Sequence, residues 1–295
     1  MKKQILYGII GVVVITLACS FGSGTPTAPT QQVDEVGTVV AATMQALLTA
    51  TSEASPTQAP TQSSGTPVSF EYASFDIPNE LASGANPEAV PAVGEDNGAP
   101  WEVAPAHLKF TLTGYPLQDK FHEPQLFIYP ADEFAQAHSG AAEQIDRLKK
   151  ALAGSPLLQE TLPIIPFFNA GPLLTANIKI IPFQNGSGVR TLTQYAQYSA
   201  PVNNRELFYH FEGLTSDNKY YVIAILPITA PFLQEDEKPE ASLPEGGVPF
   251  PANAEPSQTY YISVTEKLNS LAPDAYTPSL NTLDTLIESI LVTTP

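Results

Sequence analysis

The amino-acid sequence predicts an α+β fold, with an antiparallel sheet of about six to seven strands and helices on one face. Short apolar or alternating runs separated by turn-forming residues fill the first part of residues 68–295 and indicate strands. Amphipathic helix patterns come late in the chain, and strands do not alternate with helices as they do in a parallel sheet. We therefore expect a single domain over residues 68–295.

Three segments in the first part of this domain have strand patterns. Residues 68–77 (VSFEYASFDI) alternate and are predicted as the first strand, followed by a long loop to Pro100. Residues 107–113 show the clearest alternation in the chain. Residues 125–129 form a short apolar run between two prolines, which is typical of a strand with defined ends.

A helical pattern follows over residues 131–153. Ser139 and Gly140 interrupt it, so we expect a break there. Apolar residues recur at helical spacing in its second half, and Gly154 provides a stop signal.

The middle of the domain predicts a meander of about four antiparallel strands. The expected strands cover residues 173–183, 189–199, 207–212 and 220–228, with Gly- and Asn-rich turns between them. The last of these contains YYVIAIL, which lacks polar alternation and indicates a central strand covered on both faces.

The chain ends with an acidic loop and two helices. Residues 231–256 hold six prolines and six acidic residues, and we expect a mobile surface loop. Residues 260–271 and 280–290 place apolar side chains on one helical face each.

Composition excludes several classes of function. The 295 residues include 13 Lys and Arg against 30 Asp and Glu, a net charge of −17, which excludes a nucleic-acid partner. The single cysteine excludes an intramolecular disulfide and a zinc site built on several cysteines. The four histidines lack metal-ligand spacing, and no catalytic or phosphate-binding motif is present. We expect no cofactor, no metal and no enzymatic activity.

The first residues have the pattern of a signal peptide. A basic start (MKK) precedes an apolar run over residues 5–18, which is shorter than the roughly twenty residues that span a bilayer. Ala18 stands directly before Cys19, the only cysteine of the chain. This arrangement resembles the lipobox of bacterial lipoproteins, although Thr16 and Leu17 depart from its commonest form.

The resemblance implies cleavage between Ala18 and Cys19, removal of the signal peptide over residues 1–18, and acylation of Cys19. It also implies a lipid-anchored protein on the extracytoplasmic face of the cell membrane. The alternatives are an ordinary secretory signal or a membrane-spanning anchor with a chance cysteine.

A Ser-, Thr-, Pro- and Ala-rich tether is expected over residues 19–67, because this composition buries too little apolar area to fold. Within it, residues 33–50 have an amphipathic helix pattern. This segment is either a short helix for self-association or partner binding, or a marginal helix that frays.

The most site-like residues lie in the predicted meander. Arg190 and Gln194 occupy the same side of one strand by alternation, and His210 joins them if the hairpin register allows. An arginine inside a strand can bind an anionic ligand in a bidentate manner, or it can pair with an acidic residue of the protein. Trp101 marks a second possible binding cleft. The aromatic side chains of the chain either line such a cleft or belong to the core of the sheet.

The leading hypothesis is a lipid-anchored extracytoplasmic protein with a non-catalytic binding or structural domain. The order of its segments, a lipobox, a tether and a single domain, resembles that of bacterial envelope lipoproteins. Its partners would be the membrane, through Cys19, and an envelope protein or a small ligand. A solute-binding or sensory module for a small ligand is the alternative, and a carboxylate-based envelope hydrolase is a third possibility. The outline of the domain also loosely resembles the Mog1/PsbP-like architecture.

Overall fold

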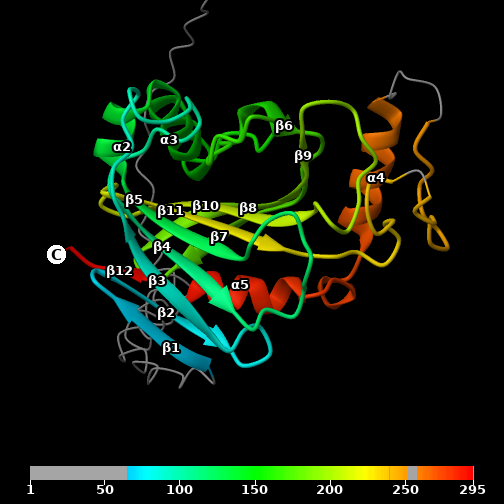
Figure 1. Ribbon diagram of the computed structural model, residues 1–295, viewed down its shortest axis with the longest axis horizontal. Coiled ribbons are helices and arrows are strands. Elements are labelled where there is room, and N and C mark those ends of the chain that lie inside the picture. The colour runs from blue at the N-terminus through cyan, green and yellow to red at the C-terminus, as the bar shows by residue number, and fades with distance from the viewer. Residues whose placement is uncertain (1–64, 239, 252–257, 295) are drawn as a thin grey trace, which may run out of the picture. The chain divides into compact units, whose positions relative to one another are not determined.

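The computed structural model describes residues 65–238, 240–251 and 258–294. Within these ranges it contains a seven-stranded antiparallel sheet and four α-helices, which confirms the α+β class (Figure 1). In the order in which they lie side by side, the strands are β3 (Gly84–Val90), β4 (His107–Thr113), β5 (Gln125–Pro130), β11 (Tyr220–Pro227), β10 (Phe208–Thr215), β8 (Gly186–Thr193) and β7 (Ala176–Phe183).

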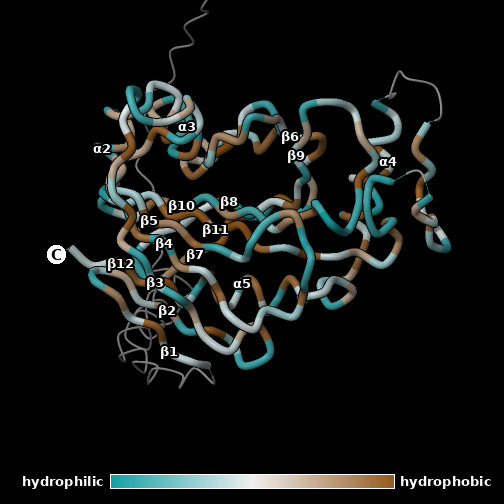
Figure 2. The backbone as a smooth tube through the Cα atoms, viewed as in Figure 1, coloured by the Kyte–Doolittle hydropathy of each residue, from teal (hydrophilic) through white to brown (hydrophobic). Residues whose placement is uncertain are grey.

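The central strands β10 and β11 are buried along their whole length, as the apolar run in β11 predicts. They form a hairpin closed at Asn218, which adopts a positive φ of 60°. Asp217 stabilises this turn by accepting hydrogen bonds from the Thr215 hydroxyl and the Lys219 amide. Figure 2 shows hydrophobic backbone segments gathered along the middle of the sheet.

Helices lie on both faces of the sheet, whereas the sequence predicts them on one face (Figure 1). α2 (Ala131–Ala137) and α3 (Ser139–Leu152) cover one face. α5 (Leu280–Glu288) packs against the other face, and α4 (Gln258–Ser270) belongs to the same apolar cluster. The reason is that β8, β10 and β11 carry apolar side chains on both sides, so each side requires a covering layer.

A second, three-stranded sheet completes the face covered by α5. It consists of β1 (Gly65–Phe70), β2 (Ala73–Pro78) and β12 (Leu291–Val292), in that order. The sequence predicted one strand over residues 68–77, but the chain reverses at Glu71, which has a φ of 51°. The first strand also begins at Gly65, before the expected start of the domain at Val68.

Strand β3 corrects the expected loop between the first strand and Pro100. It pairs with β4 in register at the edge of the large sheet, with Pro87 opposite Phe110. An edge strand tolerates proline because one side of its backbone has no partner strand. Most of its side chains are exposed, so the strand lacks the hydrophobic alternation that would reveal it.

The predicted break between the two helices is confirmed at His138. Its imidazole Nδ1 accepts a hydrogen bond from the Gly140 amide at 3.0 Å and thereby caps the N-terminus of α3. Beyond α3, the short strands β6 (Gly171–Pro172) and β9 (Tyr195–Ala196) form a separate two-stranded sheet above the large one.

The acidic segment that follows β11 is anchored at its start. Phe232 and Leu233 are buried in the core, and the Leu233 carbonyl accepts a hydrogen bond from Asn204 Nδ2. These residues therefore do not form a freely exposed loop, in contrast to the expectation for 231–256.

The predicted signal peptide, Cys19, and the possible helix over residues 33–50 lie outside the described residues, as does the expected tether up to residue 64. Among the helices that the structure does describe, none has the length and apolarity needed to cross a membrane.

Candidate functional site

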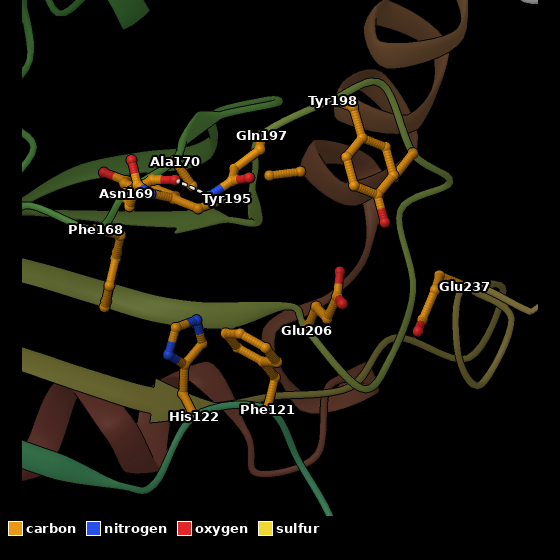
Figure 3. Close-up of a pocket in the computed structure, with 12 residues that line it drawn as sticks. Phe121, His122, Phe168, Asn169, Ala170, Tyr195, Gln197, Tyr198, Glu206 and Glu237 are labelled. Atoms are coloured by element: carbon orange, nitrogen blue, oxygen red, sulfur yellow. Dashed lines mark hydrogen bonds between the residues drawn. The ribbon is translucent and has the colours of Figure 1, made fainter.

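A cavity of about 350 Å³ lies where β8 ends and β10 begins (Figure 3). Its walls come from segments that are far apart in the sequence: the β4–β5 connection, the segment before β6, the segment around β9, and two glutamates. The lining residues are Phe121, His122, Phe168, Asn169, Ala170, Tyr195, Ala196, Gln197, Tyr198, Ala200, Glu206 and Glu237. The volume is at the lower end of the range for small-molecule sites.

Backbone pairing and hydrogen bonds hold these segments in place. Strands β6 and β9 pair with each other and bring the two upper walls together. Gln197 Nε2 donates to the Asn169 carbonyl oxygen at 2.8 Å, one residue beyond this pairing (Figure 3). The Phe121 amide donates to the Arg205 carbonyl oxygen at 2.9 Å, which fixes the lower wall next to Glu206.

Aromatic rings form the inner part of the cavity. The His122 ring lies 4.9 Å from Phe121, 5.0 Å from Phe168 and 4.5 Å from Phe208, measured between ring centroids. Phe168 in turn meets Tyr195 edge to face at 5.3 Å. Edge-to-face contacts are among the preferred arrangements of aromatic rings, so this cluster is well packed.

His122 is uncharged at neutral pH in this environment. Burial among the aromatic rings, with a smaller contribution from His210, lowers the pKa of His122 to about 4. The inner part of the cavity is therefore apolar and aromatic, and it carries no positive charge at pH 7.

Two carboxylates line the outer part. Glu206 Oε2 accepts hydrogen bonds from Gln194 Nε2 at 2.8 Å and Asn203 Nδ2 at 3.3 Å, so its orientation is fixed. Burial raises the pKa of Glu206, partly offset by the hydrogen bond from Asn203. Glu237 Oε1 lies 3.5 Å from the Arg205 guanidinium, whereas its buried Oε2 has no hydrogen-bond partner among the described residues.

The mouth of the cavity carries two exposed aromatic residues. Tyr198 is 71% exposed and Phe121 is 61% exposed. Figure 3 shows the Tyr198 hydroxyl directed toward the side of the cavity where Glu206 and Glu237 lie. Large aromatic side chains that remain in water beside a cavity are available for contact with a ligand.

A buried acid–imidazole pair lies behind this wall, on the same face of the sheet. His210 Nε2 is 2.7 Å from the Ile165 carbonyl oxygen, to which it donates as a neutral imidazole. Glu212 Oε2 accepts from the Ile165 amide and the Tyr221 hydroxyl, and its Oε1 lies 3.6 Å from His210 Nε2. Burial raises the pKa of Glu212 to about 8 and lowers that of His210 to about 4.

Arg190 lies on the opposite face and is fully engaged by the protein. Its Nη1 contacts both carboxylate oxygens of Asp284 in α5, at 3.1 and 3.0 Å. Its Nε and Nη2 donate to the Asn177 carbonyl oxygen. Tyr209 and Lys179 also donate to Asp284, so this buried cluster joins the sheet to α5.

The structure does not bring the four candidate residues of the sequence analysis together. Arg190 and His210 face opposite sides of the sheet, and neither lines the cavity. Gln194 is buried next to the cavity, where it positions Glu206. Trp101 is 44% exposed in the β3–β4 connection and does not line the cavity.

Sequence reasoning missed the residues that do line the cavity. Phe121 and Phe168 lie in connections without a motif, and their aromatic character alone indicates core as readily as binding. Glu237 belongs to an acidic run whose ordinary interpretation is a solvated surface. Nothing in the sequence of the Asn203–Asn204–Arg205 connection shows that Asn203 orients Glu206.

In the described part of the chain, no group of three or more His, Cys, Asp or Glu side chains is placed to hold a metal ion. Comparison with known proteins found no matching family model, no matching curated protein and no matching solved structure.

Proposed function

We propose that this chain is a non-catalytic binding protein, anchored by lipid at Cys19, that presents a small-ligand site on the extracytoplasmic face of the cell membrane. The observation that carries the proposal is the cavity of about 350 Å³ with aromatic inner walls and two carboxylates at its outer part. An apolar cavity with a few fixed polar groups is the usual composition of a small-molecule site.

Binding is favoured over a purely structural role by the exposed aromatic residues at the mouth. Exposed rings do not stabilise the core, and a chain gains little stability by keeping Tyr198 and Phe121 in water. Their place beside a cavity is explained if they contact a guest.

The lipid anchor rests on the sequence around Cys19. Two acyl chains give stable membrane attachment, whereas a single chain gives only marginal binding. The expected Ser-, Thr- and Pro-rich tether would then hold the folded domain away from the lipid surface.

Replacing Cys19 with alanine is expected to block acylation and cleavage, because the thiol is the acceptor of the lipid. The variant should accumulate as a precursor that retains residues 1–18. Intact-mass measurement of the membrane fraction distinguishes the two forms, with the wild-type chain as control. A Cys19→Ala chain that is still processed and lipidated would contradict the anchor.

A ligand of the cavity is expected to raise the melting temperature of the full chain. At a concentration one hundred times its dissociation constant it adds about 2.7 kcal/mol to the free energy of unfolding. We therefore expect a thermal-shift screen of sugars, amino acids, peptides, organic cations and anions to find at least one stabilising class. Tyr198→Ala should reduce the shift, because it removes a ring from the mouth without opening the core.

The matched control is Trp101→Ala, which removes an exposed aromatic ring outside the cavity. It should leave the ligand-induced shift unchanged. A shift that persists in Tyr198→Ala and disappears in Trp101→Ala would place binding elsewhere, and the absence of any shift would contradict a small-ligand function.

A further inference from the structure

We propose that the ligand of this cavity is an organic cation with an apolar body, such as a quaternary ammonium or an arylalkylammonium ion. This inference rests on the proposed small-ligand function and names its chemical class. It follows from the charges that line the cavity, from one carboxylate oxygen without a partner, and from the aromatic inner wall.

The charged side chains that line the cavity are both acidic, Glu206 and Glu237, and within the described part of the chain no Lys or Arg lines it. The nearby cations are engaged elsewhere. Lys120 pairs with Glu235 at 3.0 Å and Lys238 pairs with Asp236 at 2.9 Å. Of the Lys and Arg residues that the structure describes, only Arg205 approaches a lining carboxylate, on the Oε1 side of Glu237.

The second oxygen of Glu237 leaves this carboxylate incompletely compensated. Its Oε2 is buried and accepts no hydrogen bond from the described residues. Leaving a buried acceptor without a donor is costly, and the cost is larger for a charged group. A cation in the outer part of the cavity would offset this negative charge through space, without direct contact with the buried oxygen.

Glu206 provides the second negative group in a fixed orientation. The amides of Gln194 and Asn203 hold its Oε2. A carboxylate that is held by the protein loses little entropy when a ligand binds. Gln194, selected from the sequence as a ligand-binding residue, thus acts as a positioning residue for Glu206.

The inner wall selects against anions and favours an apolar cation. The faces of aromatic rings are negatively polarised, so Phe168 and Tyr195 in the inner wall, and Tyr198 at the mouth, attract a cation and repel an anion. His122, which would repel a cation if protonated, is neutral at pH 7. The net charge of −17 adds a long-range attraction for positive ligands.

Calorimetric titration of the detergent-purified full chain tests the class directly. The probes are choline and benzylammonium, each compared with its uncharged counterpart of similar shape, 3,3-dimethylbutan-1-ol and benzyl alcohol. We expect both cations to bind at least about tenfold more tightly than their neutral counterparts, because charge is the only substantial difference within each pair. Added salt should weaken the binding of the cations.

Two variants in one acidic segment test whether the charge of a lining carboxylate contributes to binding. Glu237→Gln removes the charge of the lining carboxylate and should weaken choline binding about fivefold, without affecting the neutral probes. Glu240→Gln is the matched control, because Glu240 lies in the same acidic segment, is exposed and does not line the cavity. It should leave choline binding unchanged.

Each alternative outcome has a distinct meaning. Neutral probes that bind as tightly as the cations, or an unchanged affinity for choline in Glu237→Gln, would overturn the cationic assignment. If those neutral probes still depend on Tyr198, the small-ligand function stands. Failure of both cations at millimolar concentration overturns the assignment as well, and the wider ligand screen then decides on the function itself.

Discussion

Replacing Asp284 with alanine is expected to lower the free energy of unfolding by about 3–5 kcal/mol, because it leaves the Arg190 guanidinium buried without its counter-charge. Both side chains of this pair are 8% exposed, so water cannot replace the lost carboxylate. The Tyr209 hydroxyl also loses its acceptor. Urea denaturation of the wild type and the variant measures the change.

Two further variants separate the ion pair from a general effect of mutation. Asp146→Ala breaks an exposed pair with Lys150 in α3 and should change the free energy of unfolding by less than about 1 kcal/mol. The double variant Arg190→Met with Asp284→Leu should recover a large part of the loss, since apolar residues fill the site without an unpaired charge. A loss below about 1 kcal/mol in Asp284→Ala would contradict a buried, fully engaged pair.

The wild-type protein is expected to lose stability as the pH rises from 6.5 to 8. The pKa of Glu212 is raised to about 8 in the folded chain by burial, from an ordinary value near 4.5. The folded state therefore holds a proton that the unfolded chain has released, and the stabilisation falls as the pH rises through the folded pKa. The loss over this interval is about 2 kcal/mol for one group.

The histidines act in the opposite direction and at lower pH. Burial lowers the pKa values of His122 and His210 to about 4. Their contribution to stability is complete about one pH unit above the unfolded value of about 6.5 and is lost as the pH falls toward 4. Between pH 6.5 and 8 each histidine still adds a few tenths of a kcal/mol, which offsets part of the larger loss from Glu212.

The variant Glu212→Gln tests this assignment, because an amide keeps the shape of the side chain and cannot ionise. We expect its stability not to fall between pH 6.5 and 8 in urea denaturation, and to rise slightly as the unfolded histidines lose their protons. Glu288→Gln, at an exposed position, should keep the wild-type pH dependence. If the stability of Glu212→Gln depends on pH as steeply as that of the wild type, another group titrates. The assignment of a neutral, buried Glu212 is then wrong.

The elements that were predicted correctly are those whose own side chains determine their structure. The hairpin of β10 and β11 and the helix α5 each combine a complete hydrophobic pattern with a recognisable turn or cap. The break at His138 was similarly visible as two poor helix formers in succession. In each case the signal lies within a few residues of sequence.

The elements that were missed depend on partners far along the chain. β3 is exposed and contains Pro87, so only its pairing with β4 reveals it as a strand. The turn at Glu71 has a positive φ, although the sequence has no glycine or asparagine at this position that would predict it. Helices on both faces follow from the two-sided burial of the central strands, which the apolar run of β11 indicates, but which helix covers which face is set by tertiary packing.

The candidate site was missed for the same reason. Arg190 was selected as a charge within a strand, but its partner Asp284 is 94 residues away and engages the guanidinium together with the Asn177 carbonyl oxygen. The cavity gathers Phe121, Phe168 and Glu237 from three separate connections. Contacts of this range are set by tertiary packing, and a single sequence carries no local signal for them.

Hydrogen exchange of the full chain with and without a stabilising ligand from the screen tests the central claim, that the aromatic cavity is the binding site. The account predicts added protection in residues 168–170, 195–200 and 234–237, which surround the cavity, and no change in α5. Protection that appears instead around α5 and Asp284, or at Trp101, would contradict it.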